Sequence, residues 1–170
     1  MMMQRLRRLL RHRWLDDADT RRAIPPALAQ RLAERVAASE RRHCGEIRIY
    51  VEAGLPLSYL WRDATPRERA IAIFGKLGVW DTEQNSGVLI YLLLAEHAIE
   101  IVADRGLARH VPQEQWRQIV QRMGGAFRAG RHEEGLAQAV DEVTALLVQH
   151  FPPRPGGVDS NELPDQPVLG

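Results

Sequence analysis

A single apolar stretch, Val88 to Ala95, constrains the fold of this chain more than any other feature. It reads Val-Leu-Ile-Tyr-Leu-Leu-Leu-Ala, and because side chains of a strand alternate between two sides, both sides are apolar. A strand of this kind lies inside a sheet that helices cover on both faces. The stretch is far too short to cross a bilayer as a helix. The chain is therefore expected to build an α/β domain around a central strand.

Two further segments have the pattern of strands that pair with this one. Glu46 to Glu52 alternates between polar and apolar side chains, which is typical of a half-buried strand. Ala98 to Asp104 follows the central strand after only Glu96 and His97, so we expect a tight antiparallel hairpin. A helix predicted between the first two strands favours a right-handed crossover, which makes those two strands parallel.

Helices are predicted wherever apolar side chains recur at helical spacing. This spacing occurs in residues 26–42, 67–77, 113–127 and 133–150. The order of elements is then helix, strand, helix, strand, strand, helix, helix. That order corresponds to a small mixed sheet of three to four strands sandwiched between helices.

The chain divides into three regions on this pattern. We predict an α/β domain over residues 23–151, a basic extension at 1–22 and a tail rich in proline, glycine and acidic residues at 152–170. A chain of 170 residues has room for one such domain with a single core. Its 23 Lys and Arg against 22 Asp and Glu leave a net charge of only +1, so nucleic-acid binding is not expected. Cys44 is the only cysteine, which excludes an internal disulfide and fits a reducing compartment.

The first fifteen residues are basic and partly apolar. Arginines interrupt each apolar pair, so a secretory signal peptide is not expected. One interpretation is an amphipathic surface helix attracted to anionic lipid or to an acidic partner, which would make residues 1–15 a peripheral membrane contact. The other is a solvated extension, frayed at the end of the chain.

Polar side chains are expected to gather at one edge of the sheet. With the first two strands parallel and the third antiparallel, the starts of the first two and the end of the third share that edge. The residues predicted there are His43, Glu46, Asp81, Glu83, Asn85, Asp104 and Arg105. Carboxylate and amide oxygens suit Ca²⁺ or Mg²⁺. The candidate metal ligands are Glu46, Asp81, Asn85 and Asp104, with Arg105 as a partner for phosphoryl oxygens.

The same residues also have a purely structural interpretation. Asp81 and Asn85 can bond their own turn backbones, while Asp104 and Arg105 can form a surface ion pair. Ser86 has neither a helical elbow nor a base with an orienting group, so it is not predicted to be a nucleophile. No catalytic residue is assigned.

Several short motifs stand out by their order and spacing. They are Gly45-Glu-Ile-Arg-Ile, Phe74-Gly-Lys-Leu-Gly-Val-Trp80, Asn85-Ser-Gly-Val-Leu, Ile99-Glu-Ile with Asp104-Arg-Gly-Leu107, and Phe127-Arg-Ala-Gly130 with Glu134-Gly-Leu136. In this arrangement, from about Pro26 to Phe151, the sequence resembles the TPM domain family. The resemblance implies a mixed sheet sandwiched by helices.

The resemblance also implies a range of functions. Divalent-metal binding and phosphatase activity are attributed to certain plant and bacterial relatives, whereas other members assist the assembly of membrane complexes or receptors. This sequence departs from the family pattern at Ser86, where a second asparagine is common, and at Ala103-Asp104-Arg105, where many members carry a Gly-Tyr type turn. The segment from Asp159 to Asp165 looks like the tail of bacterial members without a membrane anchor, which implies a cytoplasmic protein.

Two functional hypotheses follow. The preferred one is a non-enzymatic interaction or accessory module that binds a protein partner or membrane complex at the cytoplasmic membrane face, since no nucleophile and base pair is evident. The alternative is a divalent-metal-binding, phosphatase-like hydrolase that uses the predicted sheet edge.

Overall fold

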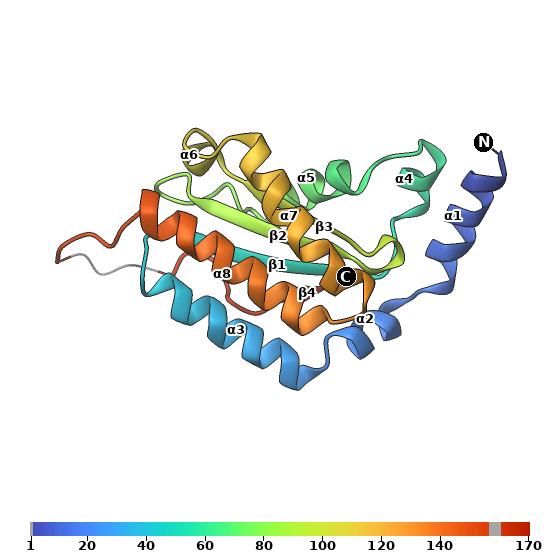
Figure 1. Cartoon of the computed structure of the whole chain (residues 1–170), viewed down its shortest axis with the longest axis horizontal. Coiled ribbons are helices and arrows are strands. Elements are labelled where there is room, and N and C mark those ends of the chain that lie inside the picture. Colours follow the sequence, from blue (N-terminus) through green and yellow to red (C-terminus); the bar gives the residue numbers. More distant parts are fainter. Residues whose placement is uncertain (1, 157–160) are drawn as a thin grey trace.

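A four-stranded sheet lies among helices in the computed structural model, which describes residues 2–156 and 161–170 (Figure 1). The strand order is β3-β2-β1-β4, with β1 at Glu46–Glu52, β2 at Gly87–Leu93, β3 at Ala98–Ala103 and β4 at Val168–Leu169. β1 and β2 pair in parallel, whereas β2 and β3 form an antiparallel hairpin. The predicted α/β class, the parallel pair and the hairpin are confirmed.

The apolar stretch forms the central strand, and every side chain from Val88 to Leu93 is 0% exposed. Ile90 and Leu92 lie in one apolar cluster with side chains of α3, α7 and α8, while Leu89 and Tyr91 lie in another with side chains of α4 and α5. Helices therefore cover both faces of the sheet, as a strand with two apolar sides requires. The bounds of these helices are α3 Pro26–Glu40, α4 Leu57–Trp61, α5 Pro66–Lys76, α7 Gln113–Arg128 and α8 His132–His150.

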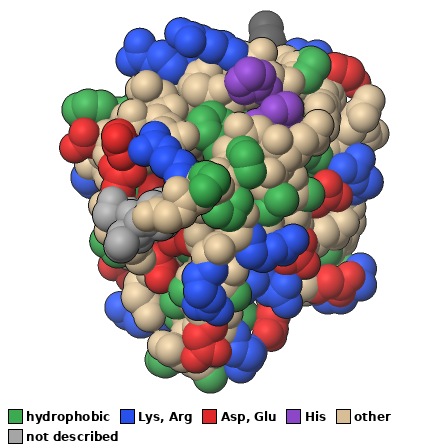
Figure 2. All heavy atoms as spheres, turned by 90° about the vertical axis from the view of Figure 1, so that its left-hand side faces the viewer, with side chains coloured by type: hydrophobic (Ala, Val, Ile, Leu, Met, Phe, Trp, Pro, Cys, Tyr) green, Lys and Arg blue, Asp and Glu red, His purple; other side chains and the backbone are tan. Residues whose placement is uncertain are grey.

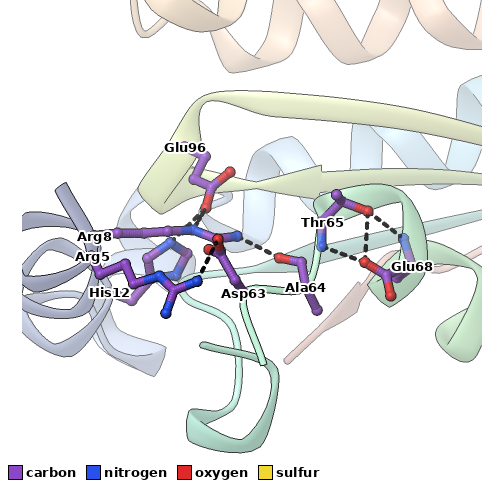
Figure 3. Close-up of polar contacts among 8 residues, drawn as sticks. All are labelled: Arg5, Arg8, His12, Asp63, Ala64, Thr65, Glu68 and Glu96. Carbon is purple, nitrogen blue, oxygen red and sulfur yellow. Dashed lines mark hydrogen bonds and ion pairs between the residues drawn. The ribbon is translucent and has the colours of Figure 1, made fainter. Parts of the chain in front are cut away.

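Local signals explain where α5 and the hairpin turn begin and end. Thr65 and Glu68 form a capping box: the Glu68 N–H donates to Thr65 Oγ1 at 3.2 Å, and the Thr65 N–H donates to the Glu68 carboxylate at 2.7 Å (Figure 3). Pro66 occupies the first helical position, where its missing N–H costs nothing. The hairpin turns through the 3₁₀ helix η1 at Leu94–Glu96 and His97, whose φ of 48° is left-handed.

Both ends of the described chain pack against the domain. The residues before Ile24 form α1 at Met2–Trp14 and α2 at Asp17–Ala23, and the last residues pair in parallel with β1 as β4. Residues 157–160, which include Asp159 of the predicted tail motif, lie outside the described residues. None of the described helices combines the length and apolar character needed to cross a membrane. A further short helix, α6, spans Arg105–Ala108 after β3.

Candidate functional site

The starts of β1 and β2 and the end of β3 lie at one edge of the sheet, as the sequence predicts; we call this the amino edge. Glu46 pairs with Gly87, and Val88 with Ala103, so Glu46 and Asp104 belong to the same end of the strands. Figure 2 views this end of the molecule and shows acidic side chains distributed among basic ones, with no single acidic hollow. The edge thus gathers ionisable groups without concentrating one sign of charge.

Glu46 is tied to the tail of the chain. Its carboxylate accepts the backbone N–H groups of Glu162 and Leu163, both at 3.1 Å. The side chain is 4% exposed, so these two bonds solvate a charge that burial has removed from water. A metal at Glu46 would have to share the carboxylate with the tail backbone.

Asp104 lies at the N-cap of α6, where one carboxylate oxygen accepts the Arg105 N–H at 2.7 Å. The other oxygen, Oδ2, is buried and has no hydrogen-bond partner among the described groups. Asn85 lies beside it: its carbonyl accepts the Gly106 N–H at 2.9 Å, and its φ of 52° is left-handed. A Cβ at Gly106 would come within 2.3 Å of that carbonyl oxygen, so this close approach requires glycine.

The remaining predicted site residues point to solvent or to turn contacts. Asp81 and Arg105 are exposed, and the part of the chain that the structure describes shows no ion pair between Asp104 and Arg105. Glu83 is also exposed, and its carboxylate lies 3.7 Å from Arg154 in the tail. Ser86 is buried, with its hydroxyl donating to the Cys44 carbonyl at 3.2 Å, which is a structural role.

His43 does not belong to the amino edge cluster in which it was predicted. It is fully buried between α3 and α8, where its Nδ1 accepts the Gly45 N–H and its Nε2 therefore carries the hydrogen that bonds Ser39. Ser39 in turn bonds Thr144 of α8 at 2.6 Å. Burial lowers the pKa of His43 to about 4, which keeps the ring neutral.

The described residues contain no group of three or more His, Cys, Asp or Glu side chains that could hold a metal ion. The Asp104 carboxylate at the end of β3 lies beside the loop at Asn85, whereas Glu46 begins β1, on the other side of β2. Such oxygens can hold a hard cation only when they converge. The predicted metal site stays a prediction.

A second polar cluster, which the sequence did not reveal, lies at the opposite ends of the strands (Figure 3). Arg8 of α1 donates to Glu96 at 2.7 Å, to Asp63 at 2.8 Å and to the Ala64 carbonyl at 2.6 Å. His12 Nδ1 accepts the Leu55 N–H at 2.9 Å. His12 Nε2 therefore carries the hydrogen and donates to Glu96 at 2.9 Å. The bond from His12, together with Arg8, holds the pKa of Glu96 below its ordinary value.

These contacts fix the orientation of α1. Arg8 and His12, four residues apart, share the face of the helix that meets the domain. The opposite side carries five apolar side chains that point to solvent, with Arg13 among them, and we call these five residues the α1 apolar face. Its residues are between 52% and 87% exposed: Met2, Met3, Leu6, Leu10 and Trp14. No sequence pattern could tell which side of α1 docks, because the partners of Arg8 lie 55 to 88 residues away.

Comparisons with known proteins identify relatives. The family model described as TPM domain matches residues 18–146. The structure is similar to that of the BA42 protein from the psychrophilic bacterium Bizionia argentinensis, with a TM-score of 0.74 and 22% identity over 86% of this chain and 95% of that one. It is also similar to the N-terminal domain of a protein from P. gingivalis, with a TM-score of 0.61 and 21% identity over 76% of this chain and 82% of that one. Comparison with curated proteins gave no match.

Proposed function

The chain belongs to the TPM domain family, and from this premise we propose that it is a non-enzymatic interaction module that attaches to anionic membrane surfaces through α1. The observation that carries the proposal is the orientation of α1. A surface helix of a globular domain normally turns its apolar stripe to the core and its polar side to water. α1 departs from this pattern: besides Leu9, its docked side chains are Arg8 and His12, while Leu6 and Leu10 face solvent.

An apolar face held outward in this way is suited to an apolar environment. Leu6, Leu10 and Trp14 follow one another at four-residue spacing and so lie on one side of the helix. Contiguous exposed apolar side chains of this kind mark contacts with proteins or membranes. The docking contacts keep this side available, because rotating the helix would remove Arg8 and His12 from Glu96 and Leu9 from the apolar cluster of α4 and α5.

The charges of α1 favour anionic lipid as the occupant. The helix has no acidic residue, and Arg7, Arg11 and Arg13 form no ion pair within the described parts of the chain. Arginine stems can lie along the apolar layer while their guanidinium groups reach lipid phosphates. A second copy of α1 would bring like charges together instead. The cytoplasmic leaflet is the anionic surface that such a helix would meet.

Vesicle sedimentation tests the proposal. We expect the unmodified protein to sediment with vesicles that contain anionic lipid, and the double variant Leu6→Glu with Leu10→Glu to lose at least about tenfold in binding, since each leucine removed from the apolar layer costs roughly 1.5–3 kcal/mol. Ile71→Glu is the matched control, because Ile71 on α5 is as exposed as Leu10, at 52%. Equal binding by the double variant and the control would overturn the role of α1.

A second candidate function is divalent-metal binding with phosphate-ester hydrolysis at the amino edge. The observation that favours it is the buried Asp104 Oδ2, which has no hydrogen-bond partner in the described residues. A buried carboxylate oxygen without a partner is costly, and a cation would satisfy it. Asn85 and Glu46 of the predicted set supply further oxygen atoms at the same edge of the sheet.

Thermal unfolding with Ca²⁺ or Mg²⁺ tests this second candidate. An ion that binds only the folded form at about 100 times its Kd stabilises it by about 2.7 kcal/mol, so Tm should rise in the millimolar range. Asp104→Asn should abolish the rise, because the amide keeps the cap on the Arg105 N–H but lacks the charge. Glu83→Gln is a nearby exposed control. An unchanged Tm in the unmodified protein, with no turnover of a generic phosphate ester, would remove the idea.

A further inference from the structure

The short helix α4 exposes apolar side chains at the same end of the molecule as α1 (Figure 1). Trp61 is 73% exposed and Leu57 47% exposed, which is unusual for large apolar residues so close together. Ion pairs link α1 to the loop that follows α4. Asp63, two residues beyond α4, lies 2.8 Å from Arg8 and 3.7 Å from Arg5 (Figure 3).

A cavity of about 340 Å³ joins the two helices further along. His12 and Arg13 line it from α1, and Leu57 and Leu60 line it from α4. The polar link through Asp63 and this shared cavity place α4 next to α1. Arg62, at the end of α4, is stacked over Tyr59 and pairs with Glu68 at 3.1 Å, so its charge is balanced locally.

The position of this pair relative to the sheet is defined by the strands. β1 and β2 run in the same direction, and the residues that follow them, Leu55 and Glu96, are those that bond His12 of α1. The helices α1 and α4 therefore lie at the carboxyl ends of the parallel strands. The amino edge lies at the other end, roughly 20 Å away for strands of this length.

Trp80 lies near the amino edge. The backbone carbonyl of Val79 lies so close to Gly87, the first residue of β2, that a Cβ there would come within 1.9 Å of it. Trp80, the next residue, is 54% exposed. The chain thus exposes one tryptophan on α1, one on α4 and one at the opposite end of the strands.

We infer that α1 and α4 form one membrane-contacting end, so that the domain stands on the bilayer with the carboxyl ends of β1 and β2 toward the lipid and the amino edge facing away. This inference rests on the proposed function, and it adds a second anchor and an orientation. Charge supports the choice of end: Arg8 pairs with Asp63 and Glu96, and Arg5 lies 3.7 Å from Asp63, so two guanidinium groups offset these two carboxylates. The orientation leaves the amino edge accessible to a soluble ligand while the protein is bound.

Tryptophan fluorescence tests the orientation. Three double variants each retain one exposed tryptophan: Trp61→Phe with Trp80→Phe, Trp14→Phe with Trp80→Phe, and Trp14→Phe with Trp61→Phe. Phenylalanine keeps the apolar character that membrane contact needs. Trp116, which is only 5% exposed, remains in all of them as a constant background that the triple variant measures.

Each variant is mixed with anionic vesicles whose acyl chains carry bromine, a short-range quencher. We expect emission from Trp14 and from Trp61 to fall by about half or more, since side chains of an interfacial helix reach the acyl boundary, and emission from Trp80 to stay unchanged. Quenching of Trp14 alone would overturn the part assigned to α4 but leave the membrane contact of α1. Quenching of Trp80 would overturn the orientation, and quenching of none would overturn the inference together with the proposed function.

Discussion

Burial changes the chemistry of Glu40, the last residue of α3. Its Oε1 accepts the Ile47 N–H at 2.8 Å, while its Oε2 is buried without a hydrogen-bond partner in the described structure. Loss of solvation, reinforced by the nearby charges of Glu46 and Asp165, raises the pKa of Glu40 to about 9. The carboxyl group is therefore neutral at physiological pH, which sequence reasoning had no means of finding.

This neutral carboxyl makes stability depend on pH. The unfolded chain releases the proton near the ordinary value of 4.5, but the folded protein holds it to about 9. Between these values the folded state binds more protons, so the free energy of unfolding falls as pH rises. In Glu40→Gln the amide oxygen can still accept the Ile47 N–H, and folding no longer requires a carboxylate to take up a proton. We therefore expect this variant to be more stable than the unmodified protein at pH 8 by on the order of 1–3 kcal/mol.

Urea unfolding at several pH values measures the effect of Glu40→Gln. The stability difference should shrink as the pH falls to 4.5 and below, where the unfolded chain also takes up the proton. Glu34→Gln, on the exposed side of the same helix, is the control. A difference that does not vary with pH would show that Glu40 is charged in the folded protein.

Among the elements, the tail depends most on non-local contacts. Residues 161–170 lie along β1. Glu46 accepts two backbone N–H groups of the tail, and Arg48 donates to the carbonyls of Pro164 and Gln166. Leu163 lies in the apolar cluster with Tyr91. β4 itself pairs only two residues with β1. The tail is thus held mainly by polar contacts and one apolar anchor.

The anchor predicts unequal effects of two leucine substitutions in the tail. Leu163 is 8% exposed, whereas Leu169 is 37% exposed. Leu163→Ala should reduce the free energy of unfolding by about 2–3 kcal/mol, and Leu169→Ala by less than about 1 kcal/mol. The loss of stability increases with the amount of buried apolar surface that the substitution removes. Chemical denaturation measures both. Equal losses would contradict the anchoring role of Leu163.

The sequence predicts the elements whose stability comes from apolar periodicity. The strand at Val88 to Leu93 and its parallel partner carry strong patterns, and the structure confirms both. The side on which α1 docks and the position of β4 were not predictable, because buried polar contacts and two-residue pairing leave no periodic signal. At the amino edge the strand order correctly brought Glu46 and Asp104 to one end. The bonds from the tail to Glu46 depend on backbone N–H groups more than a hundred residues away, which no local pattern encodes.

The whole molecule has two ends with different chemistry. One end carries α1 and α4, with exposed Leu10, Trp14 and Trp61 among arginines. The other is the amino edge, where buried carboxylates meet the tail and α6. Because a rigid sheet separates them, one end can attach to a surface while the other stays in solution.

The most direct measurement of the membrane role is a binding isotherm of the unmodified protein on vesicles of graded anionic lipid content. Binding should increase with the anionic fraction, be weak on zwitterionic vesicles, and decrease when salt is raised from low to physiological ionic strength, where the Debye length shortens to about 8 Å. Saturable binding with this dependence is the predicted result. Binding that is absent on every vesicle, or that ignores both lipid charge and salt, would contradict it.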